Sequence, residues 1–341
     1  MTVVRVRHWS VRFRARALLV GLGCALAALA LGVLSIGGGD YPMGPADVLR
    51  TLTGGGTPAE NFIIGELRLP RLVTALLVGA ALALGGAVLQ ALVRNPLGSP
   101  DILGVTQGAA TGALVVVVVG GSTLALAGAA VVGGLATGLL LWAVAWARGA
   151  HGHRLILAGI GVAAILTGVN GWLLTRAQLM DAARAVLWLT GSLDGRGWAQ
   201  AVPLAGTLAV LVPVVLFGCG PALRMTELGD DTSAALGVPV RALRTVLLVA
   251  AVLLVSVAAA AAGPVNFVAL TAPHLTRRLT RAPGPNLAAA MALGAAMLVA
   301  ADLVAQRAFT GHQLPVGVVT GALGGGYLVW LLATERKAGR L

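Results

Sequence analysis

Apolar residues follow one another in long blocks along this chain, and short polar stretches separate the blocks. Ten blocks reach transmembrane length or come close to it: residues 18–36, 69–92, 102–119, 124–147, 155–175, 199–218, 242–262, 266–280, 286–309 and 315–333. A helix of about 20 apolar residues crosses a hydrocarbon core of roughly 30 Å, whereas the strands of a membrane barrel alternate apolar and polar positions. The pattern predicts an all-α integral membrane protein, a compact bundle of about ten transmembrane helices in which 102–119 and 266–280 are short or broken.

The composition supports a single membrane domain. Hydrophobic residues make up 58% of the 341 residues and charged residues only 11%, and the mean hydropathy of +0.92 is far from that of soluble domains. We assign residues 18–333 to the transmembrane domain, 1–17 to a basic N-terminal segment and 334–341 to a tail. Cys24 and Cys219 fall inside apolar blocks, so we treat them as small core residues and not as a disulfide.

The distribution of basic residues predicts the orientation in the membrane. With the N-terminus in the cytoplasm, 17 of the 24 lysines and arginines fall in inner loops and tails and seven in outer loops, as the positive-inside rule requires. The first block contains Ala28-Leu29-Ala30, like a secretory signal peptide, but it continues to Ile36, so we expect a retained helix. Both termini are then cytoplasmic, and the net charge of +12 needs no nucleic acid partner.

Glycines inside the apolar blocks predict close packing between helices. Two sets stand out, in the second block and the last: Gly79, Gly85 and Gly86, and Gly317, Gly321 and Gly325. Small residues let helix backbones approach one another in lipid. A pore-lining role is the alternative for these glycines.

One interruption between the blocks is unusual, LQALVRNPLGSPDILG at residues 89–104. Pro96 and Pro100 end the second helix, and Asp101 lies at the start of the third, near the positive end of its dipole. Asn, Pro, Gly and Ser are ordinary turn residues. Taken alone, these residues therefore favour a tight turn on the cytoplasmic side.

Longer segments give the interruption a second interpretation. The stretch RLPRLVTALLVGAALALGGAVLQALVRNPLGSPDILG at 68–104 resembles the signature of the FecCD family of ABC importer permeases, which serve iron-siderophore, haem and cobalamin uptake. Further motifs similar to that family follow in the same order: LILAGIGVAAILTGVNGWLL at 155–174, ELGDDTSAALGV at 227–238, AGPVNFVALTAPHLTRRL at 262–279, AADLVAQRAF at 300–309 and QLPVGVVTGALGGGYLVWLL at 313–332. The resemblance covers nearly the whole chain from about residue 40, and within the family it is greatest for ferric-enterobactin permease subunits of the G type.

The resemblance implies a type II ABC importer permease, in which two permease subunits pair around a pseudo-twofold axis with the translocation path between them. It also implies that Asn95, Pro96 and Leu97 form a cytoplasmic gate. The apolar Leu97 would keep water out of the constriction, and Asn95 would fix the turn. The likeness to the G type favours a heterodimer with a second, paralogous permease, and a homodimer is the alternative.

The energy for transport is expected to come from another chain. Lys337 is the only lysine, and no GxxxxGK[ST] motif surrounds it, so the chain cannot form a phosphate-binding P-loop. We therefore expect a transport subunit that is not an enzyme and that binds no cofactor itself. ATP would bind to a separate homodimer of ATPase subunits.

The predicted docking surface for that ATPase is the loop at residues 221–241, which we call the 221–241 loop. Asp230 and Asp231 are acids suited to the start of a short helix, and Gly237 is suited to its end. Such a helix offers apolar side chains to a groove, and in similar permeases the matching segment meets the ATPase. The resemblance thus assigns this contact to eight residues: Glu227, Leu228, Gly229, Asp230, Asp231, Ala235, Leu236 and Gly237. A solvated connector is the alternative.

Two arginines flank Pro70 at the predicted outer end of the second helix, Arg68 and Arg71. The resemblance implies that they form salt bridges with acidic residues of an extracytoplasmic substrate-binding protein. The alternative is that they extend toward lipid headgroups. Some similar permeases carry another docking arginine near the end of the ninth helix, where this chain has Gln306 followed by Arg307, so a third contact is not expected.

Several polar residues fall inside the apolar blocks: Gln90, Asn170, Asn266, His274 and Asp302. An ionisable group at membrane depth is a functional candidate. The alternative is a hydrogen bond to a neighbouring helix. His151 and His153 have no Cys or carboxylate nearby in the sequence, so we predict no metal site.

The sequence therefore predicts a permease of the bacterial cytoplasmic membrane that carries out no covalent chemistry. The expected cargo is a ferric siderophore delivered by the binding protein, with haem or cobalamin as alternatives. An intramembrane enzyme is disfavoured because HExxH, GxSxG and paired facing aspartates are missing. An ion-coupled secondary transporter is also disfavoured, because only Asp302 and His274 are ionisable candidates for a charged midplane site.

Overall fold

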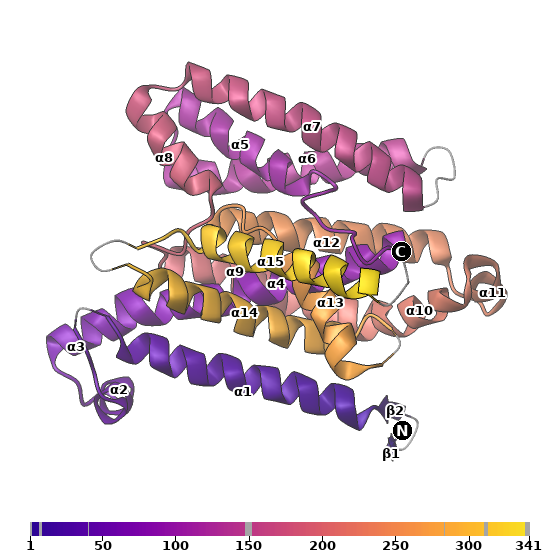
Figure 1. Cartoon of the computed structure of the whole chain (residues 1–341), viewed down its shortest axis with the longest axis horizontal. Coiled ribbons are helices and arrows are strands. Elements are labelled where there is room, and N and C mark those ends of the chain that lie inside the picture. Colours follow the sequence, from indigo (N-terminus) through magenta and orange to yellow (C-terminus); the bar gives the residue numbers. More distant parts are fainter. Residues whose placement is uncertain are drawn as a thin grey trace.

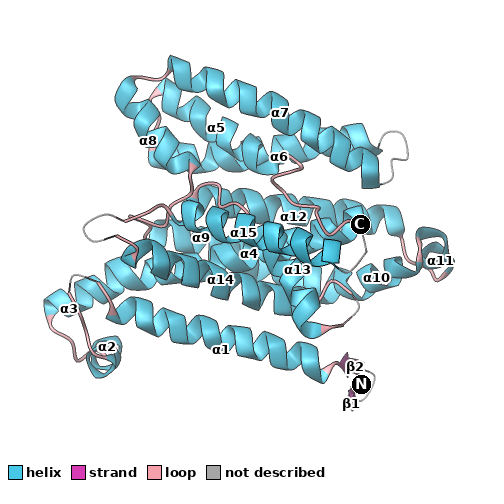
Figure 2. Ribbon diagram, in the orientation of Figure 1, coloured by secondary structure: helices cyan, strands magenta, loops and turns pink. Residues whose placement is uncertain are grey.

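The computed structural model describes residues 2–6, 9–39, 41–146, 152–282, 284–309 and 313–337. Within these residues the chain is helical from Ala15 onward, as predicted, and the long helices lie roughly side by side (Figures 1 and 2). Ahead of them, β1 (Thr2–Val6) pairs antiparallel with β2 (Trp9–Phe13) in the basic N-terminal segment. Apolar and polar residues alternate in β2, a period of two that favours a strand.

The long helices follow the predicted apolar blocks, and shorter helices that the blocks did not predict, at Pro45–Leu52, Pro58–Phe62 and Leu179–Leu189, lie between them. In chain order they are α1 (Ala15–Gly37), α2 (Pro45–Leu52), α3 (Pro58–Phe62), α4 (Leu69–Val93), α5 (Val105–Val119), α6 (Thr123–Trp146), α7 (Gly152–Arg176), α8 (Leu179–Leu189), α9 (Trp198–Pro213), α10 (Gly220–Met225), α11 (Asp230–Ala235), α12 (Val240–Ala262), α13 (Val268–Thr280), α14 (Leu287–Arg307) and α15 (Val316–Lys337). The π-helical segments η1 (Ile63–Arg68) and η2 (Val214–Cys219) join α3 to α4 and α9 to α10, and a 3-10 turn, η3 (Thr226–Leu228), follows α10.

Eight helices of the described chain are long and apolar enough to cross a membrane. The other two predicted blocks form α5 and α13, whose 15 and 13 residues extend only about 22 and 20 Å, less than the hydrocarbon core. Both are preceded by a residue with a left-handed backbone, Gly104 (φ 77°) before α5 and Phe267 (φ 68°) before α13. The prediction that these two blocks are short is therefore confirmed.

The core lies around α4 and α12. In the most apolar window of each, 78% and 72% of the residues are buried, against 11% in α1 and 17% in α7. Figure 1 shows α4 in the middle of the bundle, α1 along one side, and α5 to α8 as a layer on the other side. The faces of α1 and α7 that this chain leaves uncovered are available to lipid or to another subunit.

Glycines account for the closest helix contacts. A side chain at Gly79 would collide with the backbone of Gly294 in α14, and one at Gly86 would collide with Ala269 in α13. These two glycines pack helices, as predicted. In α15, Gly317 packs against the Thr190 carbonyl, whereas a Cβ at Gly321 or Gly325 would meet no atom within 4 Å.

Candidate functional site

A turn at residues 95–97, which we call the 95–97 turn, comes directly after the end of α4. Arg94 has a left-handed backbone (φ 54°), and the Asn95 N–H donates to the Gln90 carbonyl at 3.2 Å, which ends the helix. The Asn95 side chain then accepts a hydrogen bond from the Leu97 N–H at 2.9 Å. Asn95 thus fixes the turn in the way the sequence predicted, and the Leu97 side chain is left 50% exposed.

The chain after this turn joins the two short helices. The Asp101 carboxylate accepts a hydrogen bond from the Thr106 hydroxyl at 2.6 Å and another from the Phe267 N–H. Thr106 lies in the first turn of α5, and Phe267 precedes α13. Since a carboxylate at a helix N-terminus is favoured by the helix dipole, Asp101 stabilises both starts. The sequence predicted only the contact with α5.

The 221–241 loop forms the compact helices that the sequence predicted. Helix α11 begins at Asp230, Gly237 (φ 86°) follows its end, and α12 starts at Val240. The buried Ser233 hydroxyl donates to the carbonyls of Met225 (2.8 Å) and Gly229 (2.6 Å), which holds α11 against α10 and η3. Figure 1 shows α11 projecting beyond the bundle, at the end opposite to α2 and α3.

The eight predicted docking residues divide by exposure. Leu228 is 65% and Leu236 60% exposed. Glu227, Asp231, Ala235 and Gly237 are also exposed, whereas Gly229 and Asp230 are half-buried. The loop therefore presents two leucines and two acids on its free surface.

Asp230 connects the 221–241 loop to the end of α4, which the sequence did not predict. Its carboxylate accepts hydrogen bonds from Arg94 at 2.6 Å and from Arg244 in α12 at 2.7 Å. Arg94 also donates to the Thr226 carbonyl at 2.9 Å. Because Arg94 and Asp230 lie 136 positions apart, no local pattern could have shown the pair.

Gln90 adds a second connection one turn earlier in α4. Its side-chain amide donates to the Leu270 carbonyl at 3.0 Å, and its oxygen accepts from Arg277 at 2.6 Å. Both partners belong to α13. The last turn of α4 is thus fixed to α13 as well as to the 221–241 loop.

At the other end of α4, both predicted docking arginines make contacts within the chain. Arg68 donates to the carbonyls of Ile36 and Tyr41, each at 2.7 Å, and so caps the end of α1. Arg71 forms a bidentate ion pair with Asp302 of α14, at 3.1 and 2.9 Å. This pair is largely buried, since the Arg71 side chain is 15% and the Asp302 side chain 4% exposed. Docking through these arginines stays a prediction.

Other side chains complete this second cluster. Gln306 donates to Asp302 at 2.6 Å, and Arg71 donates to Gln313 at 2.8 Å. Asp194, in the connection between α8 and α9, lies 3.6 Å from Arg71. Arg307 instead donates to the Leu34 carbonyl near the end of α1, at 3.1 Å.

The remaining polar candidates mostly bridge helices, as the alternative explanation expects. Asn170 of α7 accepts from Thr111 at 2.6 Å and donates to the Gln107 side chain at 3.1 Å, both in α5. His274 of α13 lies 2.6 Å from the Tyr327 hydroxyl of α15. Asn266 is exposed between α12 and α13.

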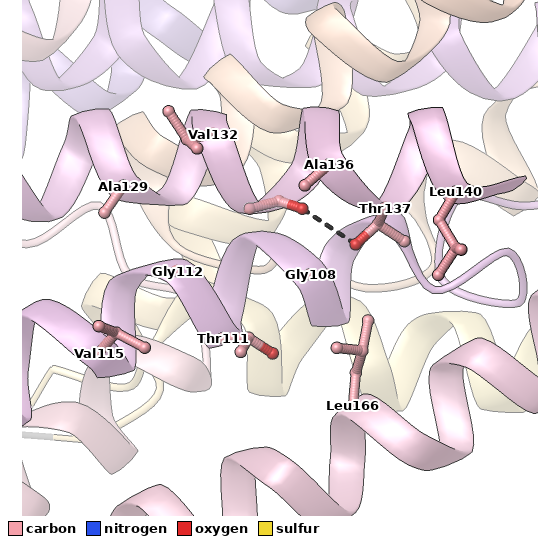
Figure 3. Close-up of a pocket in the computed structure, with 11 residues that line it drawn as sticks. Gly108, Thr111, Gly112, Val115, Ala129, Val132, Ala136, Thr137, Leu140 and Leu166 are labelled. Atoms are coloured by element: carbon pink, nitrogen blue, oxygen red, sulfur yellow. Dashed lines mark hydrogen bonds between the residues drawn. The ribbon is translucent and has the colours of Figure 1, made fainter. Parts of the chain in front are cut away.

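A cavity of about 430 Å³ lies between α5, α6 and α7 (Figure 3). Glycines, alanines, valines and leucines form most of its lining, and its two hydroxyls are engaged: Thr137 donates to the Gly133 carbonyl and Thr111 is bonded to Asn170. The lining is therefore mostly apolar, with its two hydroxyl hydrogens already donated within the chain.

The described residues also contain no cluster of three or more His, Cys, Asp or Glu side chains suited to a metal ion. His151 and the His153 side chain lie outside the described part of the chain.

Comparisons with known proteins cover nearly the whole chain. The model of the FecCD transport family matches residues 26–334. The ferric enterobactin transport system permease protein FepG of Escherichia coli K12 is 43% identical over 94% of this chain and 98% of its own. The achromobactin transport system permease protein CbrC of Dickeya dadantii is 38% identical over 91% of this chain and 90% of its own. A solved inward-facing metal-chelate type ABC transporter superposes with a TM-score of 0.80 at 28% identity, covering 93% of this chain and 99% of that one.

Proposed function

This chain belongs to the FecCD transport family, and on that premise we propose that it forms the membrane path through which an ABC importer brings a ferric siderophore into a bacterial cell. The observation that carries the proposal is the similarity to FepG along both chains. Membership of this family means that the chain is a permease with a multi-pass membrane fold. Enterobactin or a related catecholate is the proposed cargo.

The path requires a second permease subunit. Helix α7 leaves a face of small residues uncovered, where a Cβ at Gly161, Gly168 or Gly171 would meet no atom within 4 Å. Small residues allow close contact between helices in lipid, so this face supports pairing with another subunit. We propose a heterodimer with a paralogous permease, because the likeness is to one subunit type of the enterobactin system.

The ATPase homodimer would dock on the 221–241 loop. The exposed Leu228 and Leu236 offer apolar side chains to a groove, and the exposed Asp231 offers a charge at its rim. ATP binding and hydrolysis on the ATPase would then move this loop. The chain itself would supply no catalytic group and bind no cofactor.

The 95–97 turn would close the cytoplasmic end of the path. The exposed Pro96 and Leu97 are free to meet the matching turn of the second subunit, and an apolar constriction of this kind excludes water. The binding protein would dock at the opposite end of α4. To bind it there, Arg68 and Arg71 would have to divide their donors between the binding protein and the internal contacts described above, or give up those contacts.

Orientation is part of the proposal, with both termini in the cytoplasm. It is tested with single cysteines placed at Leu228 and at Tyr41, in a background where Cys24 and Cys219 are replaced by alanine. An impermeant thiol reagent added outside intact cells should modify only the cysteine at Tyr41. Modification of both positions from outside would contradict the topology.

The function is tested in proteoliposomes that contain this chain, its partner permease, the ATPase and the binding protein. Uptake of iron-55-labelled ferric enterobactin should require ATP and every partner, and excess haem or cobalamin should not compete. An ATPase that binds but does not hydrolyse ATP serves as the control. Uptake driven by an ion gradient alone, without the ATPase, would contradict the proposal.

A further inference from the structure

We infer that Asp230 transmits movement of the 221–241 loop to the 95–97 turn through its ion pair with Arg94, while Arg244 holds the Asp230 carboxylate in place. Three elements meet at one carboxylate oxygen of Asp230. Arg94 belongs to the end of α4, Asp230 begins α11 and Arg244 lies in α12, with distances of 2.6 and 2.7 Å to the two arginines. The inference rests on the proposed function, because it assumes that an ATPase moves this loop.

The two adjacent acids of α11 have different surroundings. The Asp230 side chain is 35% exposed and is held by two guanidinium groups. Asp231 is exposed and forms no ion pair with any described residue. One acid of this helix thus faces the bundle and the other faces outward. We assign docking to Asp231 and transmission to Asp230.

Arg94 is suited to transmit force because it is attached to the loop at two points. Besides its ion pair with Asp230, it donates to the Thr226 carbonyl at 2.9 Å. A guanidinium group is planar, stays charged and presents its donors in a fixed arrangement. Any displacement of Asp230 and Thr226 therefore acts on Arg94, whose backbone directly precedes Asn95.

The surroundings of α4 direct this displacement into the turn. The body of α4 is fixed by the close approach of Gly79 to α14 and of Gly86 to α13. In addition, the Gln90 side chain forms two hydrogen bonds with α13. Closely packed helices resist small shifts. The first part of the chain free to respond is the 95–97 turn, where Pro96 and Leu97 are exposed.

The test uses the complete importer with a reporter in the turn. Leu97→Cys is introduced with Cys24→Ala and Cys219→Ala, and the rate of modification by a thiol reagent is measured with and without a non-hydrolysable ATP analogue. We expect the nucleotide to change this rate, and Asp230→Asn or Arg94→Gln to reduce the change by at least about fivefold, a typical allosteric coupling factor. The double variant should lose no more than either single one, because both act through one contact.

Matched controls separate transmission from docking and from folding. Arg281→Gln removes the same charge from an exposed arginine at the end of α13, outside the 221–241 loop, that has no ion pair with a described residue. The nucleotide response of this variant should stay within about twofold of the parent's, as expected for residues outside the coupled network. Asp231→Asn should release ATPase from the complex, yet complexes that remain assembled should still respond. Asp230→Glu keeps the charge and should retain most of the response.

Three results would overturn the inference. The first is an unchanged nucleotide response in Asp230→Asn or Arg94→Gln, and the second is loss of the ATPase from Asp230→Asn, since Asp230 would then serve docking. The third is a loss of response in Asp230→Glu as complete as in Asp230→Asn. If the importer with the Leu97→Cys reporter shows the response but the unsubstituted importer takes up no ferric enterobactin, the cargo proposal fails and the inference stands.

Discussion

Replacing Arg71 by methionine should destabilise this protein, because the substitution leaves a buried carboxylate without its cation. Arg71 holds both oxygens of Asp302, at 3.1 and 2.9 Å, and also donates to Gln313. These contacts join α4, α14 and the residues that precede α15. Methionine preserves the apolar stem of the side chain, so the change removes mainly the charge and the donors.

The size of the effect follows from the burial of the pair. Removing one partner of a buried ion pair costs about 3 to 5 kcal/mol. Asp302 is only 4% exposed, but Arg71 is 15% exposed, and Gln306 still donates to Asp302 in the variant. We therefore expect the lower end of the range, about 3 kcal/mol. At roughly 2 °C per kcal/mol for a large chain, the melting temperature should fall by about 6 °C.

Intrinsic fluorescence measures this in purified, detergent-solubilised protein, since the chain has seven tryptophans. Arg184→Met is the matched control. It breaks an ion pair of 3.8 Å with Asp181 whose arginine is 77% exposed, and exposed pairs contribute only about 0.2 to 1 kcal/mol. A melting temperature for Arg71→Met no lower than that of Arg184→Met would refute the reasoning.

A second variant separates this internal role from docking. Combining Arg71→Met with Asp302→Leu removes both charges, so the loss should be about 2 kcal/mol smaller than the sum of the two single losses. If Arg71 also binds the substrate-binding protein, the double variant will be stable and will still fail to bind it. Normal binding by a stable double variant would contradict direct docking through Arg71.

Further predictions concern packing, polar bridges, docking and the turn. Gly86→Ala should force α4 away from Ala269 and cost about 2 kcal/mol or more. Gly325→Ala, with open space around it, should change stability by less than about 1 kcal/mol, and melting temperatures compare the two variants. Asn170→Ala leaves the Gln107 side-chain oxygen without its donor, while the Thr111 hydroxyl keeps its bond to the Gln107 carbonyl, and should cost about 1 to 3 kcal/mol in the same assay. Asp231→Arg should release the ATPase in a pull-down, and retention would contradict docking there. Leu97→Ala should raise ATP hydrolysis without cargo in proteoliposomes, and an unchanged rate would contradict a gate at this position.

The short elements of the site were predictable because their signals are local. Asn95 and Pro96 predict a turn from the hydrogen bond and the missing N–H that each supplies. Asp230 and Gly237 likewise predict the two ends of α11, which the structure has at Asp230–Ala235. Each of these features depends on residues within a few positions of one another.

Contacts between segments that are far apart in the chain have no such local signal in the sequence. Arg71 and Asp302 lie 231 positions apart, and Arg94 and Asp230 lie 136 apart. In the sequence, Arg71 is a docking candidate and Asp302 is an isolated polar group in a helix, and no motif pairs them. An ion pair between helices depends on their packing, which no spacing in the chain expresses.

The sequence by itself determined that this protein is a bundle of membrane helices, because lipid offers no hydrogen bonds and a long apolar segment must satisfy its backbone internally. It also determined where helices break, because Pro, Gly and Asn act on their own neighbours. Only the tertiary structure decided which charges meet. Arg71 reaches Asp302 because Gly79 lets α4 approach α14 closely, and Arg94 reaches Asp230 because α12, which follows α11, packs against α4 at Gly85. The register of those contacts places each end of α4 against its partners.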